Sequence, residues 1–196
     1  QVMFAGTDIT ASSVRQRHRM GIAHIPEDRQ KSGMISAFTV AENMVLNSYY
    51  DDSVARGLQI DWHCVEEQAA AACLKFDVRT PSVFLDAGGL SGGNQQKMVV
   101  ARELERGVRL VVASQPTRGV DVGSIEFIHK QLVACRDAGN AVLIISSELD
   151  EILDLSDRIY VMYEGQITAE FDNSSSQADR GAIGLAMAGA NRTAAA

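Results

Sequence analysis

The residues best suited to chemistry in this chain lie at positions 90–97, Leu-Ser-Gly-Gly-Asn-Gln-Gln-Lys, where a Ser-Gly-Gly turn opens an amphipathic helical pattern. The first backbone N–H groups of a helix have no partner inside it, and they lie at the positive end of its dipole. Gly92 and Gly93 place no Cβ beside those groups, so the turn can hold a phosphate without a basic side chain. The alternative is an ordinary helix capped by Ser91.

The elements that would position this turn follow it along the chain. Residues 110–113 and 141–145 are short, nearly continuous apolar runs, which are typical of buried strands in a parallel sheet. Between them, apolar residues recur at three- and four-residue steps over 125–135, which predicts a helix, and Gly139 is a suitable stop for it. The order strand, helix, strand, helix after Gly93 predicts an α/β fold, with a mainly parallel sheet flanked by helices.

A small helical subdomain is expected before the turn, over about residues 36–92. Helical patterns cover residues 39–49 and 61–76. Thr39 and Glu42 have capping-box spacing, which predicts where the first of these helices begins.

Shorter elements are expected towards both ends of the chain. The glycine in Glu164-Gly165 predicts a two-residue hairpin turn between two apolar segments. The expected strands are residues 2–10, 22–26, 159–163 and 166–171, the expected helices lie at 12–19 and within 177–188, and the tail 190–196 is expected to be disordered.

Composition favours a globular protein and argues against several functions. The 196 residues are 46% hydrophobic and 22% charged, which is enough for one core, so residues 1–189 are expected to form one domain. A net charge of −7 without a Lys/Arg-rich stripe argues against nucleic-acid binding. Three widely spaced cysteines predict neither a disulfide framework nor a metal site. No apolar run approaches the roughly 20 residues of a membrane span, so a membrane role would need a partner.

Four motifs in a fixed order give the chain a family resemblance. The Leu-Ser-Gly-Gly-Asn-Gln-Gln-Lys turn is followed by an apolar strand and by Pro-Thr-Arg-Gly-Val-Asp at 116–121, while Ile-Pro-Glu-Asp-Arg-Gln lies at 25–30 and Ser-Ser-Glu-Leu at 146–149. Together they resemble the ATP-binding cassette (ABC) ATPases. More narrowly, they look like the second nucleotide-binding domain of the tandem ATPase subunits that import simple sugars and nucleosides. The resemblance extends to about Gly189 and implies a partial P-loop NTPase-like domain.

The same resemblance marks what the chain lacks. None of its four lysines belongs to a Gly-x-x-x-x-Gly-Lys-Ser/Thr phosphate loop. In the family that loop would precede Gln1, so the chain is expected to be a fragment. The family's Asp-Glu pair, which holds Mg²⁺ and polarises water, is replaced by Ser114 and Gln115. Ser147 stands where the switch histidine is expected, and Glu27 where the Q-loop glutamine is expected.

These departures imply a half that contributes to an ATP site without hydrolysing ATP itself. Each composite site of an ABC dimer joins the phosphate loop of one domain to the signature turn of the other, where ATP and Mg²⁺ would be held. Asp121 would lie at the dimer seam near the attacking water, although a turn-forming aspartate explains its local sequence equally well. The implied binding residues are Ser91, Gly92, Gly93, Asn94, Gln95, Asp121 and Glu27.

The implied partners are the N-terminal nucleotide-binding domain of the same subunit and the membrane permease subunits, at the cytoplasmic face of the membrane. A substrate-binding protein would act indirectly. Residues 115–129 favour nucleosides over simple sugars as the imported substrate. Two alternatives stay open: a non-transport interaction or regulatory module with the ABC fold, and a decayed remnant. An independent hydrolase is poorly supported, because no proton-transfer groups or metal ligands converge in the sequence.

Overall fold

The computed structural model describes residues 1–57 and 59–190, and it divides into two compact units, Gln1–Ile145 and Ser146–Ala196. The single domain expected over residues 1–189 stays a prediction. Of the tail expected to be disordered, 190–196, residues 191–196 lie outside the described residues.

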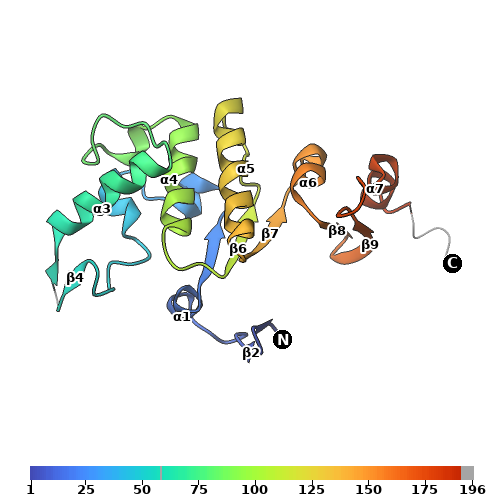
Figure 1. Ribbon diagram of the computed structural model, residues 1–196, viewed down its shortest axis with the longest axis horizontal. Helices are drawn as coiled ribbons and strands as arrows, with labels where there is room; N and C mark the ends of the chain where they lie inside the picture. The colour runs from blue at the N-terminus through green and yellow to red at the C-terminus, as the bar shows by residue number, and fades with distance from the viewer. Residues whose placement is uncertain (58, 191–196) are drawn as a thin grey trace. The chain divides into compact units, whose positions relative to one another are not determined.

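The first unit is built on a parallel sheet with the strand order β3 (Ile22–Ile25), β6 (Leu110–Ser114), β7 (Ala141–Ile145). Helix α4 (Gly92–Leu104) packs on β3, and α5 (Val122–Asp137) packs on α4 and on β7 (Figure 1). Alternate strand residues face these helices and are fully buried, namely Ala23, Ile25, Val111 and Ala113. The predicted strands and the parallel α/β arrangement are confirmed.

Near the N-terminus the structure differs from the strand expected at 2–10. Instead, β1 (Met3–Phe4) and β2 (Thr7–Asp8) form a small antiparallel hairpin. Its turn residues Ala5 and Gly6 have φ of 47° and 81°, the left-handed values of a type I′ turn, and this turn reverses the chain where one straight strand was expected. The short helix α1 (Val14–Arg19) follows as predicted.

The helical part between β3 and α4 contains more than two helices. The capping box of Thr39 and Glu42 opens α2 (Val40–Met44), as predicted, but α2 is shorter than the helix expected over 39–49. Helix α3 (Trp62–Lys75) is confirmed, and α2 packs on both α3 and α4. The sequence did not predict the hairpin of β4 (Ala55–Arg56) with β5 (Gln59–Ile60). It also did not predict the short π-helix η1 (Arg29–Gly33) and the short 3₁₀ helix η2 (Ala87–Gly89).

The second unit has its own small core. Helix α6 (Leu149–Leu155) is followed by the antiparallel pair β8 (Arg158–Tyr163) and β9 (Gln166–Asp172), and then by α7 (Arg180–Met187). Glu164 and Gly165 have φ of 49° and 76°, so the predicted two-residue hairpin is confirmed. The core consists of Leu153, Ile159, Val161, Ile183 and Ala186.

Candidate functional site

The Ser-Gly-Gly turn opens α4 as the sequence predicts, and we call residues Ser91–Gln95 the signature tip. Ser91 is the N-cap: its hydroxyl accepts the Asn94 N–H at 3.4 Å and the Asn94 side-chain amide at 3.0 Å. Among residues 1–57 and 59–190, the N–H groups of Gly92 and Gly93 donate to no protein group. The tip therefore has two free backbone donors at the positive end of a 13-residue helix, as an anion site needs.

The two glycines of the tip are required by close packing rather than by backbone conformation. A Cβ on Gly92 would lie 2.7 Å from Nη2 of Arg29. A Cβ on Gly93 would overlap the Asp121 carboxylate and the Ser124 hydroxyl. Two other segments thus lie directly against the tip, and each uses the space that a side chain would fill.

Asp121 is fixed at the beginning of α5 as its N-cap. Its carboxylate accepts the Ser124 N–H at 3.0 Å and the Ser124 hydroxyl at 2.8 Å. These hydrogen bonds, that of the hydroxyl first, lower the pKa of Asp121 below its ordinary value. An ionised carboxylate therefore lies against Gly93 and closes the turn before α5, and the role of Asp121 at a dimer seam stays a prediction.

The segment Glu27–Gln30 is more than a solvated turn. Arg29 is half-buried, and its guanidinium donates to the carbonyls of Arg118 and Gly119 at 3.0 and 3.3 Å. Exposed Glu27 forms an ion pair with Arg118. Arg29 was not among the residues singled out for binding, although its motif was, because sequence alone does not show where its side chain reaches.

The remaining polar residues of the tip support it from within. Gln95 is 4% exposed, and its amide donates to the Leu90 carbonyl at 3.1 Å while its oxygen accepts from Arg29 at 3.5 Å. Asn94 accepts the Arg79 N–H at 2.9 Å. Gln95 therefore braces the turn from inside, and its predicted place among the binding residues stays a prediction.

The end of β6 carries no acidic group. Ser114 pairs with Ile145 in the parallel register, and the Gln115 N–H donates to the Ile145 carbonyl at 2.7 Å. Gln115 has φ of 48°, a left-handed value that is unusual for glutamine. The two side chains here end in a hydroxyl and an amide, neither of which takes up a proton near neutral pH.

Comparison with known proteins gives this arrangement its context. No family model matches the chain. The nucleoside import ATP-binding protein NupA of Lactococcus lactis is 44% identical over 94% of this chain, the guanosine import ATP-binding protein NupO of Bacillus subtilis 43% over 95%, and the glucose import ATP-binding protein TsgD13 of Haloferax volcanii 41% over 94%. A solved dimeric ATP-binding cassette, in a post-hydrolysis state with ADP and Pi, matches with a TM-score of 0.70 at 19% identity, over 87% of this chain and 72% of that one. The chain belongs to the ABC ATPase family.

This cassette chain is shorter than its relatives. It spans 36%, 36% and 34% of the lengths of the three import proteins, about a third of each. The family resemblance and the cassette fold predicted from the sequence are confirmed. Among the described residues, no helix of the cassette is both long and apolar enough to cross a membrane.

The donor groups at the end of β6 do not suit a magnesium ion. Mg²⁺ in proteins is usually held through carboxylates, and the cassette offers a serine hydroxyl and a glutamine amide at the two positions where the family has Asp and Glu. In the part of the chain that the structure describes, no group of three or more His, Cys, Asp or Glu residues could hold a metal. Ser147, the third altered position, belongs to the second unit, Ser146–Ala196.

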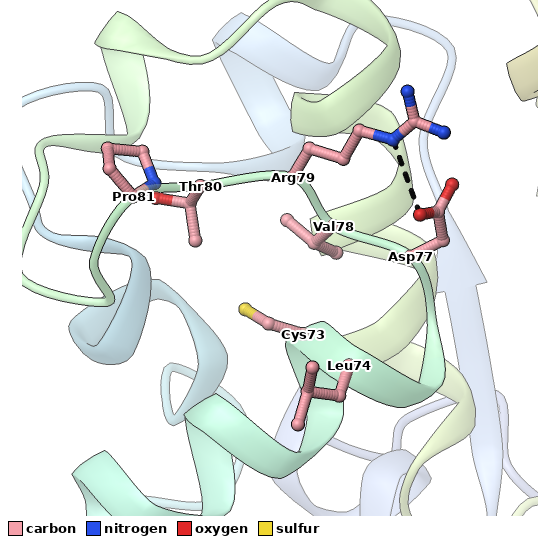
Figure 2. Close-up of a pocket in the computed structure, with 7 residues that line it drawn as sticks. All are labelled: Cys73, Leu74, Asp77, Val78, Arg79, Thr80 and Pro81. Atoms are coloured by element: carbon pink, nitrogen blue, oxygen red, sulfur yellow. Dashed lines mark hydrogen bonds and ion pairs between the residues drawn. The ribbon is translucent and has the colours of Figure 1, made fainter.

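A hollow of the cassette lies at the end of α3. Figure 2 shows Cys73 and Leu74 on one side and the segment Asp77–Pro81 on the other. Burial raises the pKa of the Cys73 thiol to about 11, so it stays protonated and is a poor nucleophile. The wall of the hollow contacts α4 at two places: the Arg79 N–H donates to Asn94 of the tip at 2.9 Å, and Asp77 forms a 2.5 Å ion pair with Lys97.

Proposed function

We propose that this chain is the part of an ABC importer ATPase subunit that donates its signature tip to ATP held by another nucleotide-binding domain. The observation that carries the proposal is the signature tip itself, which has two free N–H groups and whose Gly93 packs against the ionised Asp121. Free amides at a helix N-terminus stabilise the γ-phosphate best when they are fixed before the charge develops. Ser91 is exposed, and its hydroxyl adds a third donor.

In this proposal the chain's own half of the ATP site does not hydrolyse ATP. A general base must accept a proton, and the amide of Gln115 cannot do so near neutral pH. Ser114 offers no charge at the position where the family binds Mg²⁺, so no step is assigned to Mg²⁺ at this strand. Asp121 would help to place the water that attacks ATP in the opposite site, and Glu27 would border the same seam through its ion pair with Arg118.

The proposed partners follow from the family. They are the N-terminal nucleotide-binding domain of the same subunit, the membrane permease subunits and, indirectly, a substrate-binding protein, at the cytoplasmic face of the membrane. Relatives named for nucleoside and guanosine import support nucleosides as the substrate, and the relative named for glucose import, only slightly less similar, supports simple sugars. Substrate choice would be made by the other subunits.

The experiment is ATP turnover by the full-length subunit in its assembled importer. The phosphate-loop lysine of the partner domain is replaced in one version and the Ser114-Gln115 pair by Ala-Ala in another. We expect the first change to abolish turnover and the second to leave it nearly intact, because the partner domain holds the active phosphate loop. Turnover that survives loss of the partner's lysine would show that this half hydrolyses ATP and would refute the proposal.

A further inference from the structure

We propose that Arg29 is a positioning residue that fixes the signature tip and the loop from Arg118 to Asp121 in one arrangement, so that both reach the same nucleotide. The inference rests on the proposed function and adds to it a residue that acts through others. Arg29 comes from η1, whereas the tip begins α4 and the loop leads into α5. Three segments far apart in the sequence therefore meet at one side chain.

The hydrogen bonds of the guanidinium link the loop to the tip directly. Nη1 donates to the Arg118 carbonyl at 3.0 Å, Nη2 to the Gly119 carbonyl at 3.3 Å, and Nε to the Gln95 side chain at 3.5 Å. Guanidinium donors lie in one rigid plane, so acceptors on two elements cannot shift independently while all three bonds persist. A lysine at this position would end in one compact ammonium group, which could not donate to the loop and to the tip at the same time.

The guanidinium also fills the space beside Gly92. A Cβ there would lie 2.7 Å from Nη2, closer than real Cβ contacts come. Because Nη2 is bonded to the Gly119 carbonyl, it can move away from a new Cβ only by breaking that bond. The identity of residue 92 and the position of Arg29 are thus coupled.

Contacts at both ends of η1 hold Arg29 in place. Asp28 is the N-cap of η1, and its carboxylate accepts the N–H groups of Gln30 and Lys31, each at 3.0 Å. At the other end of η1, Gly33 is buried, and a Cβ on it would lie 3.2 Å from Pro26 and 3.4 Å from Val99 of α4. The turn is therefore packed tightly on the same helix whose tip Arg29 contacts.

Position matters here because the donors of the tip and the Asp121 carboxylate come from different helices. Displacing groups by about 1 Å can cost two orders of magnitude in rate. Gly93 lies directly against Asp121. Arg29 provides a second link, because it lies against Gly92 and donates to the loop that leads to Asp121. Without it, the loop that carries Asp121 loses two of its carbonyl contacts.

The test compares Arg29→Ala and Arg29→Lys with Lys31→Ala in the full-length subunit of the assembled importer. Lys31 is the matched control, since its ammonium has no partner within the described ranges of the chain. We expect Arg29→Ala to raise the ATP concentration for half-maximal turnover and to lower maximal turnover, each about tenfold, with Arg29→Lys intermediate and Lys31→Ala unchanged. An Arg29→Ala importer with normal ATP dependence would overturn the inference.

A double-mutant cycle with Gly92→Ala separates positioning from a general loss of stability. If Arg29 is fixed, Gly92→Ala alone should lower turnover about as much as Arg29→Ala, because the new Cβ displaces the guanidinium. The double variant should be no worse than Arg29→Ala alone, since the clash no longer exists. Losses that multiply in the double variant would mean that the two sites act independently, and would also overturn the inference.

The same assay distinguishes this inference from the proposed function. Gly93→Ala tests the tip without involving Arg29, because its Cβ would meet Asp121 and Ser124. Sensitivity to Gly93→Ala together with indifference to Arg29→Ala removes Arg29 from the mechanism and leaves the donated tip in place. Indifference to Gly93→Ala removes the donated tip and, with it, the reason for Arg29 to matter.

Discussion

The signature tip and the end of β6 belong to the same unit, separated along the chain by the rest of α4 and by β6 itself, yet they are equipped very differently. At the tip, two glycines, an arginine and a capped aspartate fit together with no room for one more carbon atom. At the end of β6, Ser114 and Gln115 pair through the backbone with β7, and neither side chain is a carboxylate. The tip is built from close packing and backbone donors, whereas the end of β6 has no carboxylate at positions 114 and 115.

Under the proposed function, this contrast separates the two duties of an ABC half-site within one fold. Presenting amides requires a rigid helix end, which packing alone provides. Activating water requires a carboxylate at one position, and no packing can replace it. Changes at the tip should therefore alter ATP turnover strongly, and changes at the end of β6 should not.

The largest effect is expected from Gly93→Ala. The added Cβ would overlap the Asp121 carboxylate and the Ser124 hydroxyl, so α4 and α5 must separate at the tip. We expect ATP turnover of the assembled importer to fall about 100-fold. Gly107→Ala is the matched control, because a Cβ there meets nothing within 4 Å and turnover should be unchanged. Equal turnover in both variants would show that the fit at Gly93 has no functional role.

A smaller loss, about tenfold, is expected from Asp121→Ala, which removes the carboxylate beside the tip. Because Asp121 is also the N-cap of α5, the variant must be compared with the loss of another aspartate cap. Asp61→Ala serves, since Asp61 caps α3. Both variants should unfold at lower denaturant concentrations, but only Asp121→Ala should slow ATP turnover. Equal turnover would reduce Asp121 to a turn-forming residue.

The charge of the Asp121 carboxylate should affect how the free energy of unfolding depends on pH at acidic values. The folded pKa of Asp121 lies below the 3.8 of a free side chain, so its carboxylate stabilises the fold fully above about pH 4 and this contribution is lost as the pH falls through the folded pKa. Denaturant unfolding from about pH 6 to about pH 3 should show wild type losing more stability than Asp121→Asn below pH 4. Parallel curves would mean that the Ser124 hydrogen bonds do not hold the charge.

Much of this contrast could be predicted from the sequence, because its main signals are local. Apolar runs predicted β6 and β7. The pattern Ser-Gly-Gly predicted where α4 begins, and the spacing of Thr39 and Glu42 predicted where α2 begins. The absence of an acidic pair needed only the residue types at 114 and 115.

What the sequence could not predict depends on contacts between distant segments. Nothing local places Arg29 against Gly92, since they are 63 positions apart in the chain and the contact exists only once η1 packs on α4. The same reason applies to Gln95. Its position in the motif predicted a binding residue, and only the packing shows that its side chain is turned inward. The turn at Ala5-Gly6 was missed because alanine rarely adopts its left-handed φ of 47°.

The smallest effect is expected from Gln115→Ala, and a second glutamine makes it informative. Gln115 lies at the end of β6, whereas Gln95 braces the tip through the Leu90 carbonyl. If the β6 end is catalytically silent, Gln115→Ala should change ATP turnover less than twofold, while Gln95→Ala loosens the turn and should lower it severalfold. A larger loss for Gln115→Ala than for Gln95→Ala would reverse the contrast, because the amide at the strand end would then act on the nucleotide more directly than the tip does.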